Sequence, residues 1–349
     1  MNRPKIISLG YAIPEHSYSQ DEIFQHLGYP SKFKRVFTSA DIDRRYFCIP
    51  LEQITKLSWQ EQEEEYQKRA TELSKQAVIN CLDNRDPKGI SCIVYGSCTG
   101  FAPGPTIAHY LSKELGFPPS TYYTNIIGQG CESGFPNLKR AYDFVVATGK
   151  QALVVNCELS CLTYFPEPDG KPDPGNHWEL LRSNAIFADA ASSALVGFDD
   201  DPRHPFIVDT ETYTDTSYLG DLGYTWRDGR LRVLLSRRVP EIAGKLVGIV
   251  VPKLLERHGL KPTDIEHYII HAAGNTVLDN IRRALGLSEE NMALSRETLR
   301  RFGNTSSTSV GITGKRLMEK HKPRPGDYAA VISLGPGMTS GATLLRWEI

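Results

Sequence analysis

The chain has 349 residues, 40% of them apolar and 23% charged, a composition typical of a soluble globular protein of one large unit or two domains. Lys and Arg total 40 against 41 Asp and Glu, which gives a formal net charge of −1. The chain therefore lacks the excess of positive charge that attracts nucleic acid or an anionic membrane. No apolar run approaches the ~20 residues of a membrane span or forms a signal-peptide core, so we expect a cytoplasmic protein without a membrane span.

Strand-like and helix-like segments alternate along the chain, which predicts an α/β fold with parallel sheets covered by helices. A long helix over residues 59–82 carries a run of glutamates that we interpret as a solvated face. Residues 165–178 contain four prolines and predict a surface loop. The other predicted helices are residues 20–27, 106–115, 132–148, 240–258, 276–285 and a segment after Gly303, and the predicted strands are residues 6–10, 90–96, 122–127, 152–158, 192–197, 207–213, 267–271, 328–334 and 342–347.

The two parts of the chain repeat one pattern. The strand at residues 90–96 leads through a helix to Leu115-Gly116, and the strand at residues 265–271 leads through a helix to Leu285-Gly286. In each part a segment of small residues then opens another helix, and a strand follows. This repetition predicts an internal duplication with halves at residues 1–200 and 201–349. Ligands of α/β folds bind outside the carboxyl ends of strands, so loops of both halves are expected to line one pocket.

Seven cysteines are present, with no Cys-x-x-Cys pair and no histidine cluster at zinc-ligand spacing, so we expect no metal site. Most of the cysteines should be small buried residues in a reducing compartment. Cys131 differs because it lies among glycines at a strand-to-helix junction. A helix N-terminus there favours the thiolate and lowers the thiol pKa from ~8.5, although Glu132 opposes ionisation unless it points away. The structural alternative is a buried, inert thiol.

Three further loops follow predicted strands or helices at matching places in the chain. His271, before Ala-Ala-Gly274, is placed as a base or hydrogen-bond donor, although a lone histidine is more often structural. Asn304, after Gly303, either caps a helix or donates to a substrate oxygen. Gly335-Pro-Gly337-Met-Thr is a glycine turn that brings backbone close to the pocket, or an ordinary tight turn.

The four loops, in this order and spacing, resemble those of the condensing enzymes of the thiolase superfamily. The closest similarity is to chalcone-synthase-like (type III) polyketide synthases and β-ketoacyl-ACP synthase III, and it includes residues 7–14 and 187–197. It implies a duplicated thiolase-like α-β-α-β-α fold of five layers, with the nucleophile Cys131 in the first half and His271 and Asn304 in the second. It also implies a homodimer with acyl-CoA or acyl-ACP as substrates.

The resemblance further implies residues that bind substrate. Lys32 and Arg35 match a basic stretch that type III enzymes use to hold coenzyme A phosphates, with Ser39 where a third basic residue is expected. Phe187 matches a gatekeeper aromatic between the coenzyme A tunnel and the cavity, and its partner position falls at Val233. The remaining matches are the cavity positions Thr99 and Thr163, Ala102 near a residue that reaches across the dimer, and the turn glycines Gly335 and Gly337.

The chemistry expected of these residues is a decarboxylative Claisen condensation. Cys131 holds the acyl group as a thioester, and His271 and Asn304 stabilise the enolate formed from a malonyl-type extender. The thioesters of coenzyme A or phosphopantetheine are substrates, and no cofactor is required. Two alternatives remain: an acyltransferase of the same fold that moves an acyl group to an alcohol or amine, and a non-catalytic partner subunit. The residues around Asn304 and the ending at 340–347 are closer to the ACP-dependent enzymes, so the carrier stays open.

Overall fold

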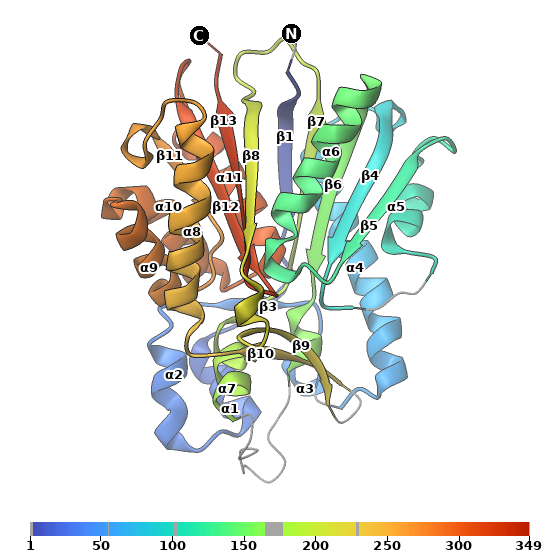
Figure 1. Ribbon diagram of the computed structural model, residues 1–349. Coiled ribbons are helices and arrows are strands. Elements are labelled where there is room, and N and C mark those ends of the chain that lie inside the picture. Colours follow the sequence, from blue (N-terminus) through green and yellow to red (C-terminus); the bar gives the residue numbers. More distant parts are fainter. Residues whose placement is uncertain (1–2, 55, 101–103, 165–176, 228–229, 349) are drawn as a thin grey trace.

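The computed structural model describes residues 3–54, 56–100, 104–164, 177–227 and 230–348. Nine of the strands in these residues form one continuous sheet (Figure 1). A single residue pair, Lys5 with Phe206, joins strands β1 and β8, so the sheet divides there into two parts. The order across the sheet is β11 (His267–Ile270), β12 (Tyr328–Gly335), β13 (Thr339–Arg346), β8 (Phe206–Thr214), β1 (Lys5–Ala12), β7 (Ala190–Gly197), β6 (Gln151–Glu158), β4 (Ile90–Ser97) and β5 (Tyr122–Ile127).

Two helices lie between the two parts of the sheet. Helix α6 (Gly134–Thr148) packs on β6 and β4 on one side and on β12 and β13 on the other. Helix α11 (Ser309–Lys320) likewise contacts β1 and β7 as well as β11 and β12. Helix α4 (Trp59–Leu82) covers the outer face of β1 and β7, and α8 (Val239–Glu256) covers β13 and β8. The result is the five-layered α-β-α-β-α arrangement that the resemblance implies.

The strands of each part run so that the catalytic loops leave one end of the sheet. Strand β4 pairs in parallel with β5 and β6, and β11 pairs in parallel with β12. Apolar side chains fill the space under α4, the space under α8, and the space around α6 and α11 between the two parts. No helix in the described ranges is long and apolar enough to cross a membrane.

Most predicted elements are present, and several have the predicted bounds, including α1 (Gln20–Leu27), α4 and β5. The predicted loop at 165–178 is wrong at its end, because helix α7 (His177–Ile186) begins there; residues 165–176 lie outside the described residues. Eight α-helices and β-strands of the described residues were not predicted. They are helix α7, the hairpin of β9 (Leu222–Arg227) and β10 (Arg230–Leu235), helix α10 (Glu289–Phe302), and four short elements, β2 (His16–Tyr18), α2 (Lys34–Thr38), β3 (Arg45–Phe47) and α3 (Leu51–Ile54). The remaining helices, α5 (Ile107–Leu115) and α9 (Asn275–Leu285), were predicted.

Helix α10 follows from its own sequence. Its N-cap Ser288 accepts a hydrogen bond from the N–H of Asn291, whose side chain accepts in turn from the N–H of Ser288. The helix ends at Gly303, whose φ of +76° suits a residue without a Cβ. An ideal Cβ there would lie 2.9 Å from the Arg45 side chain and 3.0 Å from a backbone oxygen, so glycine is also required by space. This turn delivers the chain to Asn304.

Candidate active site

Cys131, His271 and Asn304 line one cavity of about 350 Å³ at the carboxyl ends of the parallel strands. Cys131 lies in the turn Gly130–Glu132 before α6, His271 directly follows β11, and Asn304 lies between α10 and α11. Their exposed fractions are only 6%, 1% and 2%. The fold thus brings together three side chains that are separated by up to 173 residues (304 minus 131) in the sequence.

The turn that carries Cys131 packs directly against the β12–β13 turn. A Cβ on Gly335 would lie 2.6 Å from the backbone oxygen of Gln129 and the backbone nitrogen of Glu132. Gly130 has a φ of +51°, and a Cβ there would lie 2.5 Å from the Pro336 ring. Glycine at 335 therefore sets the position of the nucleophile, whereas Gly337, with a φ of +73°, adopts a turn conformation in open space. Neither of these two glycines lines the cavity, although the neighbouring Leu334 does.

Burial raises the pKa of the Cys131 thiol to about 12, so the prediction of a lowered pKa is wrong for the empty site. The hydroxyl of Ser306 donates to the sulfur at 3.2 Å and opposes this rise, while the charge of Glu158 adds to it. The helix dipole acts within the first turn, and Cys131 precedes α6 by three residues, so desolvation outweighs it. The opposing carboxylate is Glu158; Glu132 is absent from the groups that act on this thiol.

Glu158 is the main site residue that sequence reasoning missed. It ends β6, is fully buried, and accepts hydrogen bonds from the Ser307 hydroxyl at 2.6 Å and the Thr99 hydroxyl at 3.1 Å. Ser306 lies 3.4 Å from the same carboxyl group and 3.2 Å from the sulfur of Cys131. Burial raises the pKa of Glu158 despite these bonds. The sequence signal was a charged residue at the end of an otherwise apolar strand.

His271 is neutral in this site, because burial lowers its pKa to about 3. Its Nδ1 lies 2.6 Å from the hydroxyl of Ser309, and that hydroxyl also accepts from the N–H of Ala272 at 3.2 Å. Within the described part of the chain, Nε2 has no hydrogen-bond partner. Ser309 therefore holds one ring nitrogen and leaves the other for a substrate. Sequence reasoning did not identify Ser309, which opens α11 five residues after Asn304.

The Asn304 amide has a defined orientation. Its Nδ2 donates to the carbonyl oxygen of Ala273 at 3.1 Å, and its Oδ1 accepts from the N–H of Ser306 at 2.9 Å. One N–H of the amide remains for a substrate oxygen. The two interpretations of Asn304, as a cap and as a donor to a substrate oxygen, are therefore compatible. Its Oδ1 accepts from a backbone N–H at the start of a turn, and its Nδ2 still has one N–H to donate. Its backbone also pairs with that of Phe187, which lines the cavity.

The remaining predicted positions lie at varying distances from the cavity. Val233, the predicted partner position of the gatekeeper Phe187, is buried in β10 and does not line the cavity, whereas Phe187 does. Thr99 bonds to Glu158, and Thr163 bonds to the carbonyl of Ser160; neither lines the cavity. Ala102 lies outside the described residues.

The mouth of the cavity carries positive charge. Lys32 and Arg35 are exposed, and their neighbours Val36 and Ser39 line the cavity. Arg182 and Arg237, which were not predicted, line it too. Burial lowers the pKa of Arg182; the carboxylate of Glu179 opposes this fall, and the nearby charge of Arg237 adds to it. Among the described side chains, no cluster of His, Cys, Asp and Glu could hold a metal ion.

Residues 3–200 match the family model for the N-terminal domain of chalcone and stilbene synthases, and residues 255–347 match that for the C-terminal domain of 3-oxoacyl-[acyl-carrier-protein] synthase III. The chain belongs to the chalcone and stilbene synthase family. It is thus a ketosynthase-type enzyme of the type III polyketide synthase class, as the four loops predict.

Curated relatives and solved structures agree over nearly the whole chain. A 3,5-dihydroxyphenylacetyl-CoA synthase of Amycolatopsis orientalis is 29% identical over 98% of this chain and 93% of its own. A 1,3,6,8-tetrahydroxynaphthalene synthase of Streptomyces griseus is 28% identical over 96% and 91%. PKS-I of the brown alga Ectocarpus siliculosus superposes with a TM-score of 0.89 at 23% identity, covering 99% of each chain, which confirms the predicted thiolase-like fold.

Proposed function

We propose that this enzyme condenses an acyl group held on Cys131 with a malonyl-type thioester, with loss of CO2. The observation that carries the proposal is the convergence of a thiol, a neutral imidazole and an oriented amide N–H on one cavity. These are the groups that nucleophilic acyl transfer and enolate stabilisation require. No step of this reaction needs a metal or redox cofactor. We propose that the substrates are thioesters of coenzyme A. We also propose that the enzyme acts in the cytoplasm, where these thioesters are made.

The first step loads the acyl group. The thiol of Cys131 attacks the thioester carbonyl, and its proton passes to the neutral ring of His271 at Nε2. The new S–C bond forms as the bond to coenzyme A breaks, and the imidazolium returns the proton to the departing thiolate. In this step Nδ1–H donates to Ser309. After coenzyme A has left, the ring releases its Nδ1 proton to water and takes up one proton from water at Nε2, with no net change in charge. The Ser309 hydroxyl then donates to Nδ1, and Nε2–H is available for the next step.

The second step makes the enolate and the carbon–carbon bond. Nε2–H of His271 and the free N–H of Asn304 donate to the thioester carbonyl of the extender as CO2 leaves. The enolate carbon attacks the acyl carbonyl on Cys131, and the thiolate departs and regains a proton. The N–H of Cys131, which already lowers the pKa of its own sulfur, is placed to stabilise the oxyanion of this step.

Release of CO2 separates this reaction from the alternative, simple acyl transfer to an alcohol or amine. The enzyme is incubated with an acyl-CoA and ¹⁴C-carboxyl malonyl-CoA, and ¹⁴CO2 and products are measured. Condensation predicts CO2 and a product heavier by C2H2O for each extension. Acyl transfer without CO2 would overturn the proposal. The acyl specificity is open, since the relatives are named for different products, and a panel of acyl-CoA starters in the same assay would determine it.

We further propose that coenzyme A, rather than a carrier protein, binds at the cationic mouth. Arg182 and Arg237 line the outer cavity, Lys32 and Arg35 flank it, and phosphates bind such paired guanidinium groups well. Among the described residues, neither Lys32 nor Arg35 has a carboxylate within ion-pair distance. Comparing rates with acyl-CoA and the matching acyl-ACP tests the choice, and a preference for acyl-ACP would contradict it.

A homodimer is the proposed assembly. Strand β5 forms one edge of the sheet, and Tyr122 and Ile127 on it are 65% and 66% exposed. Val146 of the adjacent helix α6 is 54% exposed, so this edge combines free backbone groups with exposed apolar side chains. Light scattering should give twice the 39.0 kDa chain mass, and Ile127→Lys should shift the protein toward monomer. A monomeric native protein at micromolar concentration would contradict the assembly.

A further inference from the structure

A second cavity of about 410 Å³ is lined by residues at the start of β1 and the end of β13, Ile6 and Leu345 among them. The two chain termini emerge at this end of the sheet (Figure 1). We name this cavity the terminal cavity. It shares no lining residue with the cavity that contains Cys131. Its apolar wall is formed by side chains of six strands (β1, β6, β7, β11, β12 and β13), of the two central helices, and of the segment after β13, with Ile6, Leu138, Val154, Val310, Leu317 and Trp347 among them.

Two of the polar side chains that line this cavity, those of Asn156 and Ser192, belong to residues that are only 5% and 2% exposed. The Oδ1 of Asn156 accepts from the side chain of Asn137, but no residue of the described ranges bonds to its Nδ2 or to the hydroxyl of Ser192. Both donor atoms are open to the cavity rather than sealed in the interior, so a ligand or water inside the cavity can satisfy them.

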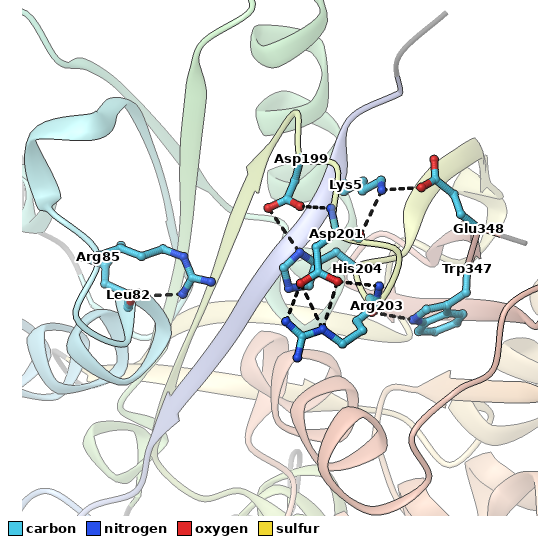
Figure 2. Close-up of polar contacts among 9 residues, drawn as sticks. All are labelled: Lys5, Leu82, Arg85, Asp199, Asp201, Arg203, His204, Trp347 and Glu348. Atoms are coloured by element: carbon cyan, nitrogen blue, oxygen red, sulfur yellow. Dashed lines mark hydrogen bonds and ion pairs between the residues drawn. The ribbon is translucent and has the colours of Figure 1, made fainter.

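The mouth of the terminal cavity is positively charged, in contrast to the near-neutral chain as a whole. Its lining includes Arg85, Arg203 and Lys315 against one carboxylate, Asp83. Figure 2 shows Arg85 and Arg203 on opposite sides of strand β1, with Arg203 held by Asp201. The only bond of Arg85 to the described residues is to the carbonyl of Leu82 at 3.2 Å. Lys315 has only a 3.6 Å contact with a glutamate on its own helix.

We propose that the terminal cavity binds an amphipathic carboxylate, that is, a medium-chain acyl anion. Arg85 and Lys315 would contact the carboxylate at the mouth, and the hydrocarbon chain would pack on the apolar wall beside Trp347. Charge complementarity selects the anion, and the volume falls within the ~300–1,000 Å³ typical of small-molecule sites. The ligand would touch α6 three residues after Cys131, at Gly134, and α11 at Val310, but none of the reacting groups.

Trp347 makes the site observable. Its ring lines the cavity and is 1% exposed, whereas Trp59, Trp178 and Trp226 are 46%, 52% and 47% exposed and lie elsewhere. The probe is 10-bromodecanoate, whose bromine quenches tryptophan fluorescence at contact. Titration should give saturable quenching that Trp347→Phe removes. Enzyme alkylated at Cys131 with iodoacetamide should be quenched equally, which separates this site from the catalytic cavity.

Two sets of variants test where and how the probe binds. Arg85→Ala combined with Lys315→Ala should weaken binding about tenfold, while Arg283→Ala combined with Lys322→Ala, a matched loss of exposed charges outside the cavity, should not. Ala194→Leu, which adds three carbons to a lining residue, should abolish binding. Unchanged thermal midpoints establish that each variant folds; if Ala194→Leu does not fold, Ala194→Val replaces it.

The proposal fails if the probe binds the variant with Arg85→Ala and Lys315→Ala as tightly as the native enzyme, or if 10-bromodecanol binds equally well. It also fails if alkylation of Cys131 removes the quenching, because the probe would then occupy the catalytic cavity. Weaker binding in 0.5 M salt supports it, since exposed charges are screened beyond a few ångströms at that ionic strength. None of these outcomes depends on turnover, so they are independent of the proposed condensation.

Discussion

Glu132, beside the nucleophile, is expected to make the enzyme less stable as pH rises. Its side chain is 2% exposed, and burial raises its pKa to about 8 from an ordinary value of 4.5. Between these two values the native state keeps a proton that the unfolded chain releases. The free energy of unfolding therefore falls by about 1.4 kcal/mol per pH unit over this window, about 5 kcal/mol in all. Below pH 4.5 the contribution is complete, and above pH 8 it is lost.

Glu132→Gln removes the titration while keeping the shape of the side chain. Urea unfolding of both proteins between pH 4.5 and 9 gives the difference in their free energies of unfolding, in which titrations common to both, such as those of His271 and Asp189, cancel. The variant should gain stability over the native enzyme progressively from pH 4.5 to 8 and level off beyond. Parallel curves would refute the reasoning, because they would mean that the carboxyl group is solvated and titrates near 4.5 in the folded enzyme.

Three further predictions concern the catalytic cavity. Asn304→Ala should keep self-acylation of Cys131, seen by mass spectrometry, yet release CO2 ~10²–10³-fold more slowly; normal CO2 release would leave Asn304 as a cap only. Ser309→Ala should slow CO2 release ~10-fold with KM for malonyl-CoA unchanged, and it should lower the thermal midpoint because the N–H of Ala272 loses its acceptor; a lower midpoint with CO2 release unchanged would make the residue structural only. Replacing Lys32 and Arg35 by Ala should raise KM for acyl-CoA but not for the N-acetylcysteamine thioester, and equal losses would indicate a role in folding.

The sequence was sufficient for the elements that carry their own signals. Helix α4 begins at Trp59 after the capping residue Ser58 and ends at Leu82, as its pattern predicts. Helix α10 carries an equally clear capping signal at Ser288 and was predictable, although no element is predicted for residues 287–302. The hairpin of β9 and β10 was predictable too, because Asp228-Gly229 between the two strands is a dipeptide typical of tight hairpin turns. The division at residue 200 stays a prediction.

That Cys131, His271 and Asn304 meet at one cavity could be predicted, because each residue stands in a recognisable loop. Their ionisation could not, because the pKa values depend on burial by segments far apart in the chain. Glu158 and Ser306, 148 residues apart, meet at Cys131 only in the folded state. A local argument from the helix N-terminus gave the wrong direction for the thiol pKa, since desolvation by these distant segments is the larger effect.

The pKa values of Cys131 and His271 shift in opposite directions because both side chains are buried. Burial removes water from both groups and so favours the uncharged form of each, a thiol with a pKa of about 12 and an imidazole with a pKa of about 3. A thiolate–imidazolium pair would require both groups to charge in the empty cavity, which this environment opposes. The proton must therefore move when the substrate carbonyl is already in contact with the sulfur, so that charge passes directly to the forming oxyanion.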